Sequence, residues 1–163
     1  MRNMDDFPDS DGSAPPADYR FRKMSEPDLA NVLAIERKTY EFPWSETIFK
    51  DCLRVNYHCY VIESVQQVKG YAVMTVAAGE SHILNICVDE SLRGSGVGRS
   101  MLAHLVDQAK SHRAEMMLLE VRASNKVAID LYLNSDFNEI GRRNAYYPAK
   151  DGREDALILA RIL

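Results

Sequence analysis

A glycine-rich turn between a strand and a helix limits what this chain can fold into more than any other feature of its sequence. Residues 93–99 read Arg-Gly-Ser-Gly-Val-Gly-Arg and follow an apolar run that ends at Val88. The residues after it repeat an apolar side chain every four positions, as in an amphipathic helix that ends near His112: Val97, Met101, Leu105 and Ala109. The sequence therefore predicts a strand, a glycine turn and a helix in direct succession.

Such a junction favours the binding of an anion. Glycines let the main chain approach a ligand closely, and the first N–H groups of a helix have no partner within it. Hydrogen bonds and the helix dipole then stabilise a bound anion, and pyrophosphate is the expected ligand. A dinucleotide fingerprint would need glycine in place of Arg99, and a P-loop would need Gly-Lys followed by Ser or Thr. A turn that serves only the geometry of the chain stays an alternative.

The periodicity of the rest of the chain predicts an α/β (α+β) fold with the element order ααβββαβαβ. Ser25, Ser45 and Asn125 are the expected N-caps of three further helices. The strand–helix–strand step favours parallel pairing, so we expect a mixed, mostly antiparallel central sheet with helices on both faces. The predicted helices span residues 25–40, 45–53, 97–112 and 125–133, and the predicted strands span residues 57–62, 68–77, 82–88, 116–121 and 156–162.

Length and composition set the limits of this prediction. The chain has 163 residues, of which 46% are hydrophobic and 27% charged, as expected for one globular domain. Residues 1–18 are acidic and rich in Pro, Gly and Ser, so we expect a disordered tail before a domain over residues 19–163.

The same composition excludes several classes of protein. Cys52, Cys59 and Cys87 form no C-x-x-C pair, which argues against a disulfide framework or a thiolate metal site and favours the cytoplasm. The four histidines have no metal-ligand spacing, so we expect no metal. No run of 18 apolar residues is present and the formal charge is -4, so we expect neither a membrane span nor nucleic acid as a partner. The oligomeric state is left open.

The glycine turn also resembles a known signature. Arg93-x-x-Gly96-x-Gly98 is similar to the Q/R-x-x-G-x-G/A motif of the GNAT superfamily of N-acetyltransferases. The resemblance implies the GNAT fold and acetyl-CoA as co-substrate. It also implies that the turn binds the pyrophosphate through Arg93, Gly94, Ser95, Gly96, Val97, Gly98 and Arg99. The preceding strand would contact acetyl-CoA through the backbone of Ile86, Cys87 and Val88, with the Val88 N–H polarising the thioester carbonyl.

A second set of motifs resembles the bacterial RimI branch, the ribosomal-protein alanine acetyltransferases. These motifs are Phe42-Pro43-Trp44-Ser45, Leu119-Glu120-Val121-Arg122-Ala123-Ser124-Asn125 with Tyr132, and Tyr146-Tyr147-Pro148, which Ala145 precedes as an extra residue. The resemblance implies transfer to the N-terminal alanine of ribosomal protein S18. It assigns Glu120 as general base, Tyr132 as general acid, Asn125 as a coenzyme A contact, and Trp44, Tyr146 and Tyr147 to the acceptor groove.

The chemistry of the reaction agrees with these roles. An amine must lose a proton to attack a thioester directly, and the thiolate that leaves gains one. An α-amine has a reference pKa of about 8, against about 10.4 for lysine, so a carboxylate base deprotonates it more easily. The plainer alternatives are a Glu120 paired with Arg122 and a Tyr132 that only packs in the core. Broader N-terminal, lysine or small-amine acetylation, or a non-catalytic acetyl-CoA sensor, are the alternative functions.

Overall fold

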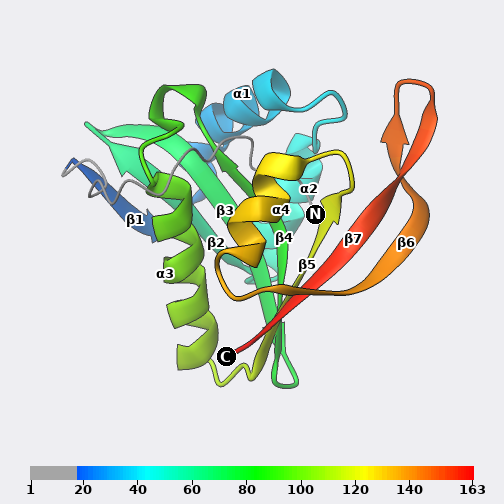
Figure 1. Cartoon of the computed structure of the whole chain (residues 1–163). Coiled ribbons are helices and arrows are strands. Elements are labelled where there is room, and N and C mark those ends of the chain that lie inside the picture. Colours follow the sequence, from blue (N-terminus) through cyan, green and yellow to red (C-terminus); the bar gives the residue numbers. More distant parts are fainter. Residues whose placement is uncertain (1–17) are drawn as a thin grey trace.

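In the computed structural model, which describes residues 18–163, seven strands form one sheet in the order β1-β2-β3-β4-β5-β7-β6 (Figure 1). All neighbours are antiparallel except β4 and β5, so the expected mixed, mostly antiparallel sheet is confirmed. The strands are β1 Tyr19–Lys23, β2 His58–Ser64, β3 Gln67–Ala77, β4 Glu80–Val88, β5 Met116–Arg122, β6 Asn138–Ala149 and β7 Gly152–Ile162. Apart from Asp18, the expected tail over residues 1–18 lies outside the described residues.

Two pairs of helices cover the two faces of the sheet, as expected (Figure 1). The helices are α1 Leu29–Thr39, α2 Glu46–Arg54, α3 Val97–Ser111 and α4 Lys126–Leu133, and the 3-10 turns are Glu26–Asp28 and Glu90–Leu92. One core lies between the sheet and α3 with α4, and a second lies between the sheet and α1 with α2. No helix within residues 18–163 has the length and apolar character needed to cross a membrane.

The order ααβββαβαβ was wrong in two places, because it omitted both edge strands. β1 precedes α1 and pairs with β2, and β6 lies outside β7 at the other edge. An edge strand that is exposed to solvent needs little apolar content, and the β6 sequence NEIGRRNAYYPA has almost no apolar alternation. The last strand also begins at Gly152 instead of residue 156.

The predicted helix caps are largely confirmed. The Ser45 hydroxyl accepts from the Ile48 N–H at 3.3 Å, and Asn125 Oδ1 accepts from the Ala128 N–H at 3.1 Å. The Ser25 N–H donates to the Asp28 carboxylate at 2.9 Å, but a 3-10 turn follows, so the α-helix begins only at Leu29. The sequence therefore predicted the residue that makes the capping hydrogen bond at all three positions.

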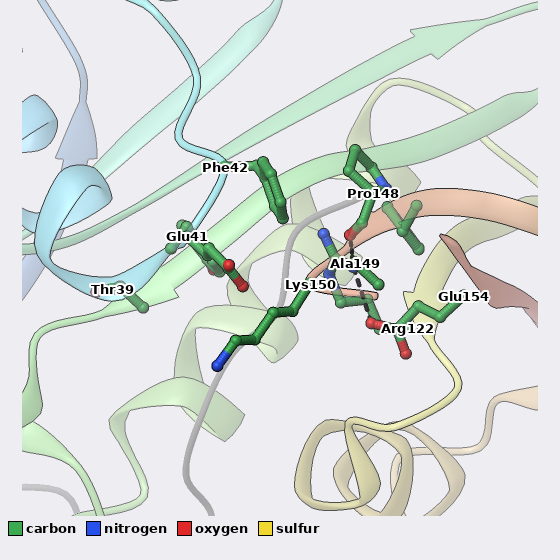
Figure 2. A pocket seen from close by; sticks show the side chains of 10 residues that line it. Thr39, Glu41, Phe42, Arg122, Pro148, Ala149, Lys150 and Glu154 are labelled. Atoms are coloured by element: carbon green, nitrogen blue, oxygen red, sulfur yellow. Dashed lines mark hydrogen bonds and ion pairs between the residues drawn. The ribbon is translucent and has the colours of Figure 1, made fainter. Parts of the chain in front are cut away.

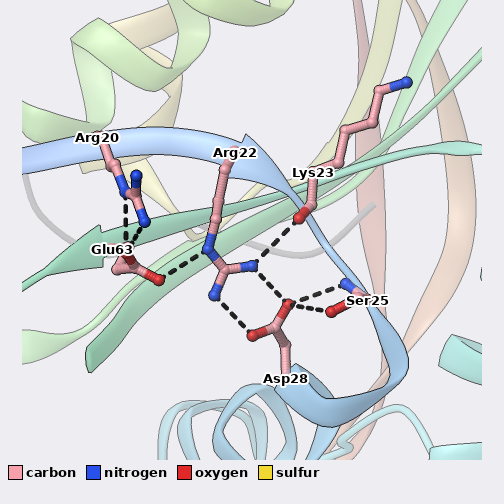
Figure 3. Close-up of polar contacts among 6 residues, drawn as sticks. All are labelled: Arg20, Arg22, Lys23, Ser25, Asp28 and Glu63. Atoms are coloured by element: carbon pink, nitrogen blue, oxygen red, sulfur yellow. Dashed lines mark hydrogen bonds and ion pairs between the residues drawn. The ribbon is translucent and has the colours of Figure 1, made fainter. Parts of the chain in front are cut away.

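An ion-pair network attaches β1 to its neighbours (Figure 3). Both terminal nitrogens of the Arg22 guanidinium donate to the Asp28 carboxylate at 2.8 Å, and Nε donates to Glu63 at 2.7 Å. The Asp28 side chain is only 9% exposed. Paired, partly buried charges of this geometry resist solvent screening better than surface pairs, so the network fixes β1 on β2 and on the start of α1.

We expect Asp28→Asn to lower the free energy of unfolding by about 2 kcal/mol at neutral pH, because Arg22 loses a charge-assisted partner. The hydrogen bonds from Arg22 lower the pKa of Asp28 below its usual value of 3.8. Such a carboxyl adds stability that is present above pH 3.8 and is lost as the pH falls through the folded-state pKa. The difference between wild type and variant should therefore shrink in acid.

Urea unfolding at neutral pH and below the unfolded-state pKa measures this difference. Asp51→Asn, which removes an exposed carboxylate at 3.3 Å from Arg54, is the control and should change little at either pH. An equal loss of stability for Asp28→Asn at both pH values would contradict the assigned ion pair.

Candidate active site

The site is built around a separation of two neighbouring strands. β4 and β5 pair in parallel only from Glu80 with Met116 to Ile83 with Leu119. Leu84 forms a β-bulge, since Val73 and Met74 of β3 pair with Asn85 and Ile83 and leave no partner for it. A bulge bends its strand, so beyond this point β4 diverges from β5. We call the opening between residues 84–88 of β4 and residues 120–122 of β5 the fork.

The backbone of β4 directs polar groups into the fork. The Asp89 N–H donates to Lys69 at 2.7 Å on the β3 side, and Cys87 pairs with Tyr71 of β3. Because hydrogen-bonding direction alternates along an antiparallel strand, the backbone groups of Ile86 and Val88 face away from β3. The Tyr40 hydroxyl donates to the Ile86 carbonyl at 3.1 Å from that side.

Cys87 turns its side chain into the second core and its backbone toward β3. Its thiol is 1% exposed, and burial raises its pKa to about 11. A protonated, buried thiol is a poor nucleophile, so Cys87 has a packing role at this position. Of the three β4 residues predicted to contact acetyl-CoA, Ile86 and Val88 are the ones whose backbone faces the fork.

The predicted glycine turn lies between the outer end of β4 and the start of α3. Gly94 and Gly96 have φ angles of 73° and 81°, the left-handed region that glycine adopts without strain. The Ser100 N–H donates to the Gly96 carbonyl at 3.1 Å as the first bond of α3, so the N–H groups of residues 97–99 have no acceptor within the helix. The buried Arg93 Nε also has no hydrogen-bond partner among the described residues. These donors fit the anion site expected from the sequence.

We expect Gly96→Val to weaken acetyl-CoA binding by at least about tenfold, because a β-branched residue at positive φ is strained by roughly 1–3 kcal/mol and adds bulk beside the turn amides. Gly79→Val is a matched control, since Gly79 also has a φ of 81° but lies in the β3–β4 turn with open space around it. Calorimetric titration with acetyl-CoA makes the measurement. Equal affinity for Gly96→Val and wild type would remove the pyrophosphate assignment.

Glu120 lies at the base of the fork, one residue beyond the last β4–β5 pair. Its side chain is 20% exposed and accepts a hydrogen bond from Arg143 Nε at 2.7 Å. The alternative pairing of Glu120 with Arg122 was wrong, because Arg122 donates to Glu154 at 2.8 Å and to the Pro148 carbonyl at 2.7 Å. The sequence did not predict the pairing of Arg143 with Glu120, because it did not predict the strand that carries Arg143.

Tyr132 of α4 is fully buried and packs edge-on against Phe137. Its hydroxyl has no hydrogen-bond partner among the described residues. Burial raises the pKa of Tyr132 well above its usual range, so the phenol stays protonated at neutral pH. An unsatisfied buried hydroxyl costs roughly 1–3 kcal/mol, and its presence in a native site calls for a ligand or a catalytic role. The Tyr132 hydroxyl is therefore a protonated donor without an acceptor among residues 18–163.

Tyr146 and Tyr147 of β6 both contact Glu120. The Tyr147 hydroxyl donates to the Glu120 carbonyl at 3.2 Å, and the pKa of Tyr147 is raised by burial first and then by Glu120. The pKa of Tyr146 is raised by burial first and then also by Glu120, with which it forms a side-chain hydrogen bond. Ala145, at φ 49°, lies in a register shift of β6 against β7. Ala145 thus lies in a bulge of β6, and both tyrosines that follow it lie beside Glu120.

Two pockets lie along β5 on the face that α1 and α2 partly cover. The hairpin pocket, shown in Figure 2, is lined by Thr39, Tyr40, Glu41, Phe42, Arg122, Tyr147, Pro148, Ala149, Lys150 and Glu154. The strand pocket is lined by His82, Ile83, Leu84, Leu118, Leu119, Glu120, Arg143, Tyr146 and Ile158. Glu41 and Lys150 face each other across the hairpin pocket and escaped the sequence analysis, because only the tertiary fold brings them together (Figure 2).

The structure brings two other predicted residues less directly to the site. The Trp44 ring packs on Phe49 at 5.3 Å between centroids and lines neither pocket. Asn125 is buried as the N-cap of α4, and its Nδ2 has no hydrogen-bond partner within residues 18–163. Contact of Trp44 with an acceptor and of Asn125 with coenzyme A stay predictions.

Comparison with known proteins points to one family. Residues 24–137 match the model of the acetyltransferase (GNAT) family. The [ribosomal protein bS18]-alanine N-acetyltransferase of Escherichia coli K12 is 38% identical over 133 residues, which cover 82% of this chain and 90% of that protein. The protein of the same name from Haemophilus influenzae is 31% identical over 134 residues, with 82% and 91% covered.

A solved structure agrees with the sequence comparison. The crystal structure of the ribosomal-protein-S18-alanine N-acetyltransferase from Escherichia coli superposes with a TM-score of 0.83 at 35% identity, and covers 88% of this chain and 93% of that one. The two proteins thus share the fold over most of both chains.

Proposed function

The chain belongs to the GNAT family of acetyltransferases, which take acetyl-CoA as donor, and we propose that it acetylates the α-amino group of the N-terminal alanine of ribosomal protein bS18. The relatives named above carry this activity in their names. The observation that supports it most is Glu120, which lies at the base of the fork and lines the strand pocket. We further propose that residues 19–163 form the one catalytic domain and that, with a ribosomal acceptor, it acts in the cytoplasm.

The fork and the glycine turn are the proposed donor site. Acetyl-CoA supplies an activated acetyl group, whose thioester carbonyl carbon is the electrophile. The N–H groups at the start of α3 would hold its pyrophosphate, and the Val88 N–H, which faces the fork, would donate to the thioester carbonyl oxygen. Because these contacts use main chain, they place few demands on the side chains of β4.

The proposed chemistry is direct transfer between the two substrates. The amine nitrogen forms a bond to the carbonyl carbon while the bond from carbon to sulfur breaks. Glu120 takes up the proton of the amine, directly or through water, and the Tyr132 hydroxyl gives a proton to the departing thiolate. The raised pKa of Tyr132 keeps its hydroxyl protonated at neutral pH. The chemistry needs no metal, and within residues 18–163 no group of three His, Cys, Asp or Glu side chains is placed to hold one.

The acceptor peptide is proposed to lie in the hairpin pocket, with its amine toward Glu120. Tyr147, which lines this pocket, donates to the Glu120 backbone carbonyl, and Glu120 itself lines the strand pocket. An α-amine suits a carboxylate base, since its reference pKa of about 8 leaves a larger neutral fraction than that of lysine. Glu41 and Lys150 present opposite charges to the peptide across the pocket (Figure 2).

A peptide panel tests this proposal. Released coenzyme A is measured with peptides of the bS18 N-terminus that begin with free alanine, with blocked alanine, or with blocked alanine and an added lysine. We expect transfer only where the α-amine is free. Transfer to the lysine peptide would favour a broader acetyltransferase, and acetyl-CoA binding without transfer to any amine would favour a sensor.

A further inference from the structure

A carboxylate with no part in the proposed chemistry lies fully buried in α1. Glu36 has 0% of its surface exposed. The Trp44 backbone N–H donates to it at 2.8 Å, Asn85 Nδ2 donates at 3.1 Å, and the Tyr71 hydroxyl donates through a short bond. Burying a carboxylate is costly unless hydrogen bonds replace its water. These three donors come from the α1–α2 segment, β4 and β3, so Glu36 joins parts of the chain that are distant in sequence.

On one side, Glu36 holds the strand that forms the fork. Asn85 directly follows the bulge at Leu84, so its bond to Glu36 fixes β4 at the point where the strand leaves β5. One helical turn after Glu36, the Tyr40 hydroxyl donates to the Ile86 carbonyl at 3.1 Å. Residues four apart lie on the same face of a helix. The end of α1 is therefore hydrogen-bonded to two consecutive residues of β4, Asn85 and Ile86, where β4 diverges from β5.

On the other side, Glu36 holds a wall of the hairpin pocket. Residues 39–42 form that wall, and they lead directly into Trp44. The bond from the Trp44 N–H to Glu36 folds this segment back over the last turn of α1. A single side chain thus fixes both the wall that would touch the acceptor and the strand that would touch the donor.

We propose that Glu36 is a positioning residue that sets the hairpin-pocket wall against the fork, so that an acceptor amine in the pocket reaches a thioester in the fork. The inference rests on the proposed function for the acceptor in the hairpin pocket and for the thioester in the fork. Glu36 acts through Trp44, Asn85 and Tyr71, and it contacts neither substrate.

Glu36→Ala tests the proposal against a matched control. Asp28→Asn also alters a buried acidic residue, but Asp28 lies just before the opposite end of α1 and bonds Arg22 and Ser25, away from the fork. We expect Glu36→Ala to raise the KM for the peptide by about tenfold or more and to lower kcat, with acetyl-CoA affinity changed less than about threefold, because a lost charged hydrogen bond is worth about a factor of ten. Asp28→Asn should leave the peptide KM unchanged despite its lower stability.

Glu36→Gln adds a rescue arm. Its amide oxygen can still accept from the Trp44 N–H, so the pocket wall is kept, and the peptide KM should return to within about threefold of wild type. A role in stability alone predicts that the peptide KM follows the melting temperature across Glu36→Ala, Glu36→Gln and Asp28→Asn. That correlation would overturn the proposal.

Hydrogen–deuterium exchange provides a readout that needs no acceptor. Glu36→Ala should speed exchange at residues 40–44 and 85–88 and leave β1 unchanged, whereas Asp28→Asn should speed exchange near β1 only. The same exchange pattern in both variants would contradict the positioning role. If the wild type acetylates no bS18 peptide, the proposed function fails, and the exchange comparison still decides the role of Glu36.

Discussion

Glu120→Gln is expected to lower kcat by about 10²- to 10⁴-fold, the contribution of a positioned general base. Glutamine keeps the size of the side chain but cannot take the proton from the amine. Acetyl-CoA affinity should stay unchanged, because the proposed donor contacts come from the backbone of β4 and the glycine turn. Single-turnover kinetics with the bS18 peptide, together with calorimetric titration of acetyl-CoA, measure the two effects separately.

Two control variants separate the base from its surroundings. Glu139→Gln removes an exposed glutamate of β6, whose side chain is 48% exposed, and should leave kcat unchanged. Arg143→Gln breaks the ion pair to Glu120 but keeps the carboxylate. A loss of kcat in Arg143→Gln equal to that in Glu120→Gln would assign the effect to the ion pair, and an unchanged kcat in Glu120→Gln would remove Glu120 from the mechanism.

Tyr132→Phe is expected to lower kcat and, at the same time, to raise the free energy of unfolding. Loss of the general acid should lower kcat by about 10²-fold. The Tyr132 hydroxyl is buried without a hydrogen-bond partner among the described residues, so its removal should raise the free energy of unfolding by about 1 kcal/mol. Steady-state kinetics and urea unfolding of the same preparation measure both quantities.

Tyr60→Phe is the matched control for Tyr132→Phe. Tyr60 is also a buried tyrosine of the same core, but its hydroxyl donates to Gln108 at 3.0 Å. Its removal should lower stability and leave kcat unchanged. A Tyr132→Phe enzyme that keeps wild-type kcat would show that Tyr132 only packs against Phe137, the plainer alternative drawn from the sequence.

The sequence predicted those parts of the fold that local chemistry determines. The caps at Ser45 and Asn125, the β2–β3–β4 meander and the strand–turn–helix around Gly96 depend on neighbouring residues, and each could be inferred without tertiary contacts. The edge strands could not, because β1 has only 5 residues, β6 does not alternate apolar with polar residues, and both are defined by their pairing with β2 and β7.

In the candidate site, too, the contacts between residues distant in sequence could not be predicted. Glu120 and Tyr132 could be named because a resemblance supplied their positions, and their catalytic roles stay predictions. The partner of Glu120 could not be named, since Arg143 lies 23 residues away on a strand that was not predicted. The Glu36 network was also invisible, because its donors Tyr71 and Asn85 lie 35 and 49 residues further along the chain.

The most direct test of the proposed function uses the full-length acceptor. Unmodified bS18 is incubated with acetyl-CoA and the wild-type enzyme or Glu120→Gln, and fragmentation mass spectrometry locates any added acetyl group. We expect one acetyl group on the α-amine of the N-terminal alanine with wild type, and almost none with Glu120→Gln. An N-terminal alanine that stays unmodified with the wild-type enzyme, or acetyl groups found only on lysine side chains, would contradict the proposed function.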